Sequence, residues 1–116
     1  MDETTELAPW LPIDEVLVWL KVSRDDPELV AIAETCRVAA AAYCVEQRPD
    51  LAPEQLGEHR GLRMAALLSC ARLYARRNTP TGLASFGEFG ASDILRFDPD
   101  VARLLGTGRH ARPRVG

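Results

Sequence analysis

Residues 23–49, SRDDPELVAIAETCRVAAAAYCVEQRP, decide the fold class of this chain. Asp26 can accept hydrogen bonds from free backbone N–H groups, and Pro27 suits the first position of a helix. Apolar residues then recur at steps of four and three, the stripe of a buried helix face: Leu29, Ala33, Cys36, Ala40 and Tyr43. Pro49 ends the pattern. The stretch predicts one long helix with a buried face.

A second long helix is predicted from about His59 to Asn78, after a connection over residues 50–57. Its inward-facing residues are expected to be Met64, Leu67, Leu68, Ala71, Tyr74 and Ala75. The alanines at 39–42 would let the two helices approach closely. We therefore expect an antiparallel pair, each helix about 30 Å long, with short helices packed across it.

Shorter elements flank this pair. Residues 13–22 are predicted to be a short helix, and residues 92–97 alternate enough for a weak strand at most. Asp98-Pro99-Asp100 has the same capping pattern as Asp26-Pro27 and is predicted to begin another helix, which ends at Gly106.

The expected fold class is all-α, a small helical bundle with a long loop and a flexible C-terminal tail. Residues 1–9 are predicted to be a flexible acidic leader, residues 10–106 the helical domain, and residues 107–116 a basic tail.

Composition indicates an ordinary globular chain. With 116 residues, 47% apolar and 27% charged, it has room for one domain. The longest apolar run, residues 38–45, is far shorter than the roughly 20 residues that span a membrane. The acidic start lacks the pattern of a signal peptide. We expect a protein that is soluble and intracellular when made.

The net charge of −3 hides a polarity along the chain. Residues 1–58 hold thirteen acidic and four basic residues, a balance of −9, whereas residues 59–116 hold ten basic and four acidic residues, a balance of +6. Such a split occurs when helix faces are simply solvated. The other interpretation is association, in which the acidic part of one copy faces the basic part of the next.

The sequence offers no converging catalytic set. His59 and His110 lie at a helix start and in the tail, with no suggested nucleophile or carboxylate partner. Cys36, Cys44 and Cys70 form no CxxC pair and are expected to be small core residues. The acidic pairs Asp25 with Asp26 and Asp98 with Asp100 lie where helices begin with proline, so they are interpreted as capping residues and not as a catalytic pair. The prediction is a non-enzyme without cofactor or metal.

Nucleic-acid binding is the alternative function. Arg72, Arg76 and Arg77 cluster on the second long helix, and the tail is basic. The sequence pI of about 5.4 and the lack of a recognisable recognition helix argue against it. A third hypothesis is a helical partner-binding module of the antitoxin or chaperone kind.

Several short motifs carry a resemblance to a known family. They are Leu73-Tyr74-Ala75-Arg76-Arg77-Asn78-Thr79-Pro80-Thr81-Gly82-Leu83, the stretch from Leu11-Pro12 through Trp19-Leu20, Phe86 to Gly90, and Arg96-Phe97-Asp98-Pro99-Asp100-Val101 running into Leu104-Leu105-Gly106. In this order they span almost the whole domain, although residues 1–9 and 23–58 match only by helical pattern. The chain resembles the head–tail adaptor (connector, or head-completion) proteins of long-tailed phages, especially those that infect actinobacteria.

The resemblance implies a connector-adaptor bundle of about four helices. Such a protein is a virion component made in the host cytoplasm, a monomer alone that assembles on the portal as a ring of about twelve copies. The ring extends the DNA channel and offers a docking surface to the stopper or tail-completion protein. The packaged DNA would pass without sequence-specific binding, so we expect a neutral or acidic lumen drawn from the N-terminal half.

Seven residues are candidates for partner contacts. Arg76 and Arg77 would pair with acids of a neighbouring subunit or the portal, or else lie in solvated or intrachain salt bridges. Phe86 and Phe89 would anchor an interface or cover the protein's own core. The tail arginines would meet carboxylates along the portal wall, or belong to a disordered end: Arg109, Arg112 and Arg114.

Overall fold

Helices are the regular elements of the part of the chain that the structure describes, residues 8–78, 95–96 and 98–107 of a computed structural model. They are α1 (Ile13–Leu20), α2 (Pro27–Gln47), the 3-10 turn η1 (Pro53–Gln55), α3 (Arg60–Ala75) and α6 (Pro99–Leu105). No strand occurs among the described residues. The prediction of an all-α fold is confirmed. No helix of this part of the chain is long and apolar enough to cross a membrane.

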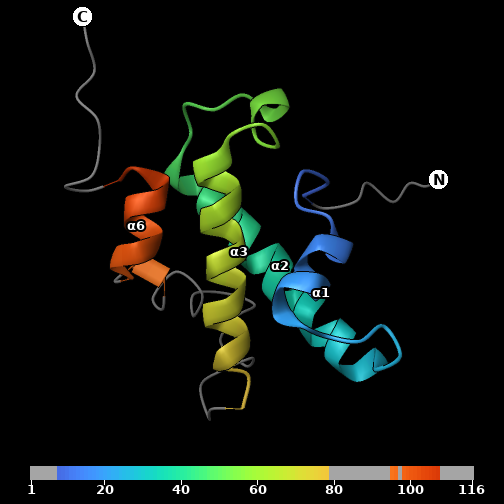
Figure 1. Cartoon of the computed structure of the whole chain (residues 1–116). Coiled ribbons are helices and arrows are strands. Elements are labelled where there is room, and N and C mark those ends of the chain that lie inside the picture. Colours follow the sequence, from blue (N-terminus) through green and yellow to red (C-terminus); the bar gives the residue numbers. More distant parts are fainter. Residues whose placement is uncertain (1–7, 79–94, 97, 108–116) are drawn as a thin grey trace, which may run out of the picture.

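The two long helices form the centre of the domain. In Figure 1, α2 passes behind α3, and the chain runs upward in α2 and downward in α3. Small buried residues at their contact, including Ala40, Ala66 and Cys70, let the two backbones approach closely. Helix α1 packs against both, and α6 packs against the other side of α3.

Helix α2 begins as the sequence predicts. The Asp26 side chain accepts a hydrogen bond from the Leu29 N–H at 3.1 Å, and Pro27 occupies the first helical position. The helix ends at Gln47, just before Pro49. The predicted stripe is largely correct, because Ala33, Cys36, Ala40 and Tyr43 are buried, while Leu29 is half-buried.

Helix α3 differs from its prediction in length and in orientation. It begins after His59 but ends at Ala75, and a turn follows to Asn78. The predicted inward set is wrong for Met64 and Ala75, which are exposed. The buried face comprises Leu62, Ala65, Ala66, Leu67, Ser69, Cys70 and Leu73. The helix is therefore rotated by part of a turn from the predicted phase.

Helix α6 is fixed to α3 at both of its ends. Arg72 of α3 donates to the carboxylates of Asp98 (2.7 Å) and Asp100 (3.1 Å). At the opposite end, a Cβ on Gly61 would lie 2.7 Å from the carbonyl oxygen of Leu104, so only glycine permits this close approach. Gly106 ends α6 in the left-handed region, as predicted.

The weak strand predicted over residues 92–97 is not supported where the structure describes it. Leu95 and Arg96 are helical, and Leu95 is fully buried in the core. Residues 92–94 and 97 lie outside the described residues. The strand was predicted from a short alternation of apolar and polar residues, a pattern that a single helical turn also fits. The helical turn places Leu95 in the core.

Asp98 provides a test of how α6 is held. Burial raises the pKa of its carboxyl, but hydrogen bonds from Arg72 and from the Val101 and Asp100 amides outweigh this, so the pKa lies below its ordinary value. The resulting stabilisation is present above the ordinary pKa and is lost as the pH falls below it. We expect Asp98→Ala to destabilise the fold by about 1–2 kcal/mol at pH 7, mainly through the lost cap.

Urea denaturation at pH 7 and at pH 3 measures this effect. The difference between Asp98→Ala and the unchanged protein should shrink at pH 3. If the two proteins differ in free energy of unfolding by the same amount at both pH values, the charge on Asp98 does not contribute to stability.

Candidate interaction surface

The three cysteines and His59, which lie in the described part of the chain, serve the fold. Burial raises the pKa of Cys36 to about 11 and that of Cys44 to about 12, and it also raises the pKa of Cys70. All three thiols are therefore protonated core residues at neutral pH. Nδ1 of His59 accepts the Leu62 N–H at 3.0 Å and so caps α3. The described residues contain no His, Cys, Asp and Glu group able to hold a metal ion.

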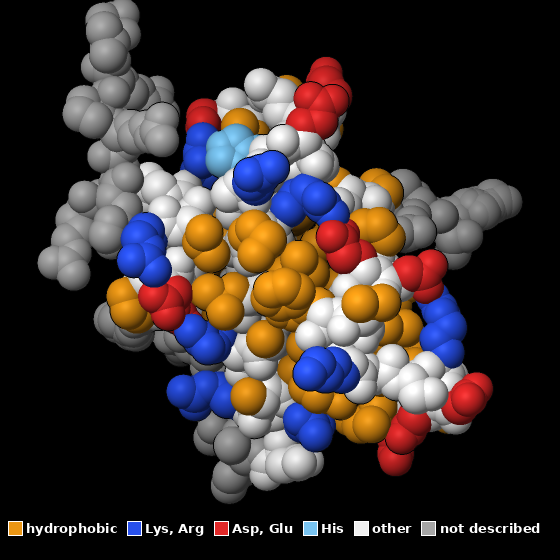
Figure 2. Space-filling view, in the orientation of Figure 1, with side chains coloured by type: hydrophobic (Ala, Val, Ile, Leu, Met, Phe, Trp, Pro, Cys, Tyr) orange, Lys and Arg blue, Asp and Glu red, His pale blue; other side chains and the backbone are white. Residues whose placement is uncertain are grey.

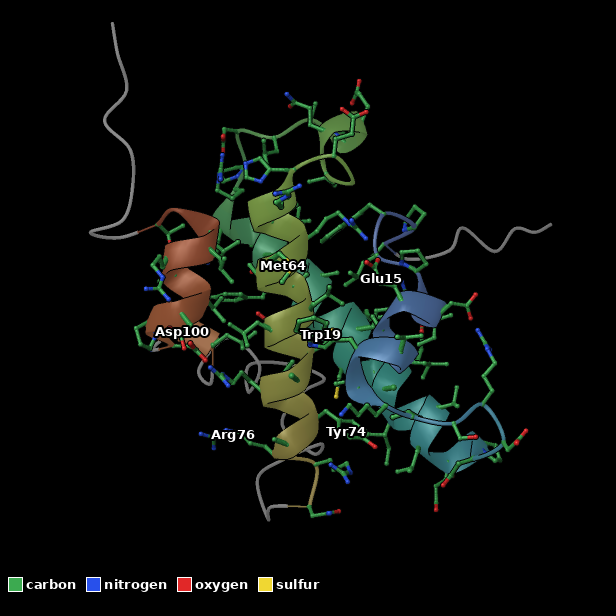
Figure 3. The ribbon with its side chains drawn as sticks, in the orientation of Figure 1. Glu15, Trp19, Met64, Tyr74, Arg76 and Asp100 are labelled. Atoms are coloured by element: carbon green, nitrogen blue, oxygen red, sulfur yellow. The ribbon has the colours of Figure 1, made fainter. Side chains whose placement is uncertain are left out.

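The structure places two of the seven candidate interface residues. Arg77 lies 3.9 Å over the ring of Tyr74 and donates to the Tyr74 carbonyl at 2.9 Å. Its guanidinium is thus engaged within its own chain. Arg76 is exposed at the end of α3, and its side chain extends away from the helix (Figure 3). The other five lie outside the described residues: Phe86, Phe89, Arg109, Arg112 and Arg114.

An apolar surface covers the outer side of α3. Met64 is 36% exposed, and Trp19 of α1, on the same side of the molecule, is 42% exposed (Figure 3). Leu68, Ala71 and Ala75 continue along α3 at helical spacing, the first two half-buried and the last exposed. Figure 2 shows that hydrophobic side chains gather over α3 and the neighbouring part of α1. We call these five residues the α3 face.

Positive charge borders the α3 face. Residues 59–78 contain five arginines and no acidic residue. Arg60 is exposed at the upper end, Arg76 is exposed at the lower end, and Lys and Arg side chains lie above and below the apolar area in Figure 2. Arg63 forms an ion pair with Glu15 of α1, which ties the two helices together next to Trp19.

The prediction that this surface faces the core is wrong for Met64 and Ala75, which are exposed, whereas Leu68 is partly buried against the core. Four of its residues, Met64, Leu68, Ala71 and Ala75, were expected in the core. The mismatch is informative, because a helix face with core composition and no cover within the described residues is typical of a protein contact site.

The basic half of the chain is partly neutralised by its own acids. Arg63 pairs with Glu15, Arg72 pairs with Asp98 and Asp100, and Arg103 reaches Asp100 at 3.3 Å. These ion pairs reduce the positive charge that is available to bind the phosphates of a DNA duplex.

Comparison of the chain with models of known protein families, with curated proteins and with solved structures finds no match.

Proposed function

We propose that this chain is a structural virion protein, a head–tail adaptor that forms a ring beneath the portal of a long-tailed phage. The observation that supports the proposal best is the α3 face. An exposed Trp and Met bordered by arginines match the composition of interface centres, in which these three residue types are enriched. A subunit of an assembly needs such a surface, and a monomeric protein rarely leaves one open.

The ring extends the DNA channel and gives the stopper or tail-completion protein a place to dock. The all-α fold is consistent with this proposal, since the two long helices α2 and α3 pack together and the short helices α1 and α6 pack against them. Neighbouring copies, about twelve of them, contact each other side by side. Packaged DNA passes through a neutral or acidic lumen, since bound arginine would retard it.

A DNA-binding regulator is the competing function. Exposed Arg60 and Arg76 favour it, whereas the intrachain pairs of Arg63, Arg72 and Arg103 reduce the charge available to phosphates. A helical module with one small protein partner is the third possibility.

Sedimentation of the purified chain separates the three. The adaptor function predicts a monomer that binds portal oligomers of the phage encoding it and shows no salt-sensitive binding to duplex DNA at low micromolar concentration. Duplex binding without portal binding would support the regulator instead, and a stable small heterocomplex would support the partner-binding module.

The basic tail is expected to contribute to portal binding. Removing residues 109–116 deletes three arginines, each of which can pair with a portal carboxylate for about 0.5–1 kcal/mol at an exposed site. The truncated chain should therefore bind portal oligomers about tenfold more weakly or worse. Binding titrations at low and physiological salt measure this, and unchanged affinity would exclude the tail from the contact.

A further inference from the structure

The outer side of α2 carries a second apolar stripe. Its members recur at steps of four and three along the helix, and all are exposed except the half-buried Val38: Ala31, Thr35, Val38, Ala42 and Val45. The Thr35 hydroxyl donates to the Ala31 carbonyl at 3.2 Å, so it needs no external partner. Glu28 and Glu46, both exposed, lie at the two ends. We call these residues the α2 stripe.

The α2 stripe and the α3 face lie on opposite sides of the helix pair. The side of α2 that faces the core carries Ala33, Cys36, Ala40 and Cys44, which are fully buried. The stripe residues lie about half a turn away from these. The corresponding buried side of α3 carries Leu62, Ala66 and Leu73, so the α3 face points away from α2. Each molecule thus presents one surface at its front and the other at its back.

The two surfaces match in spacing and length. Met64, Leu68, Ala71 and Ala75 also recur at steps of four and three, the repeat with which two helices interlock side chains. The charged residues that flank the two surfaces are similarly spaced, since Glu28 and Glu46 lie about 27 Å apart along α2 and Arg60 and Arg76 about 24 Å apart along α3. The α3 face carries large side chains, Trp19 and Met64, whereas most members of the α2 stripe are small, Ala and Thr.

Their charges are opposite. Arg60 and Arg76 flank the α3 face at its two ends, whereas Glu28 and Glu46 flank the α2 stripe at its two ends. A symmetric dimer through α3 would bring arginines together, and one through α2 would bring glutamates together. Only contact between α2 of one copy and α3 of another places opposite charges at both ends.

We propose that α2 of one copy packs on the α3 face of the next, so that this contact links the subunits of the ring. A head-to-tail contact between unlike surfaces can close into a ring, whereas a symmetric contact gives only a pair. The inference rests on the proposed function and adds the surfaces by which the copies meet.

Cysteine crosslinking of the full chain tests the contact. Val38→Cys marks the centre of the α2 stripe and Ala71→Cys the α3 face, so the pair reports on the contact whichever way the helices run. The native thiols are buried and do not interfere. At high protein concentration with a short bis-maleimide, the mixed pair should form dimers about tenfold faster than either variant alone. Ala42→Cys replaces Val38→Cys if that variant fails to fold by circular dichroism.

Charge reversal supplies a matched control. Arg60→Glu with Arg76→Glu in the Ala71→Cys chain should slow crosslinking about fivefold, and Glu28→Arg with Glu46→Arg in the Val38→Cys chain should restore it, because both ends then carry opposite charges again. A merely structural effect of the two arginine substitutions would not be rescued by changes in the partner chain.

Three outcomes would overturn the contact: dimers of Ala71→Cys alone that form as fast as the mixed pair, mixed dimers no faster than those with Glu54→Cys on the η1 turn, or no rescue by charge reversal. Failure of this test with portal binding intact would leave the adaptor function standing. Absence of portal binding would contradict the function itself, whatever the crosslinking shows.

Discussion

Replacing Arg37 with alanine is expected to lower the free energy of unfolding by about 3 kcal/mol, an effect as large as the loss of a buried core side chain. Arg37 is 2% exposed although it is charged. Its Nη1 donates to the carbonyls of Ala8 (2.9 Å) and Leu11 (2.8 Å), while Nε and Nη2 form a two-pronged pair with Glu34 at 2.8 Å. The guanidinium thus holds the segment before α1 against α2.

The loss has two causes. Alanine leaves the Leu11 carbonyl buried without its donor, and it opens a cavity where the side chain had packed. Arg37→Lys keeps the charge but cannot reach all three partners, so it should lose about 2 kcal/mol. Glu34→Gln should lose less than about 1 kcal/mol, because that carboxylate is partly in water.

Urea denaturation followed by circular dichroism measures all three variants. An Arg37→Ala protein within about 1 kcal/mol of the unchanged protein would show that the two carbonyls find other partners, and that the segment before α1 is not fastened in this way.

Replacing Met64 with glutamate is expected to abolish assembly while leaving the fold intact. Met64 is exposed, so the change should alter the free energy of unfolding by less than about 1 kcal/mol. At the centre of the α3 face, the new carboxylate would be desolvated in the contact with a neighbouring copy. Truncating or charging a central interface residue costs about 2 kcal/mol or more, a factor of about 30 in affinity at each contact.

Complementation of a phage that lacks the gene is the measurement. Met64→Glu should yield heads without this chain and infectious titres lowered at least about a hundredfold, because every contact in a ring carries the change. Gln47→Glu adds the same charge at an exposed position outside both surfaces and should leave titres unchanged. Normal titres with Met64→Glu would remove the α3 face from assembly.

The capped helix starts could be predicted because the signal is local. Asp26 and Asp98 each accept N–H bonds from residues two or three positions further on, and a proline follows each of them. The burial of Cys36 and Ala40 followed from the regular spacing on α2. These features depend on the residue types within a single turn or a single helix.

The orientation of α3 could not be predicted in the same way. Helix α3 carries apolar residues on more than one side, with Leu62 on one side and Leu68 on another. The spacing of these residues therefore does not determine which side of the helix faces the core. The choice is made by the positions of α1 and α6, which cover only its flanks. Arg37 was missed for a similar reason, since its backbone partners lie 26 and 29 residues away in the sequence.

The candidate site was found only in part. Arg76 and Arg77 were selected because they end a helix, but Arg77 stacks on Tyr74 of its own chain. Met64 was expected to face the core, and Trp19 was not among the candidate interface residues. What makes them candidates for an interface is their exposure, which depends on the tertiary arrangement.

Reconstruction of the head–tail junction in purified virions tests the central claim most directly. The adaptor function predicts a ring of about twelve copies of this chain beneath the portal, with α2 of each copy on α3 of the next and a lumen without arginine. Virions that lack this polypeptide altogether would contradict it.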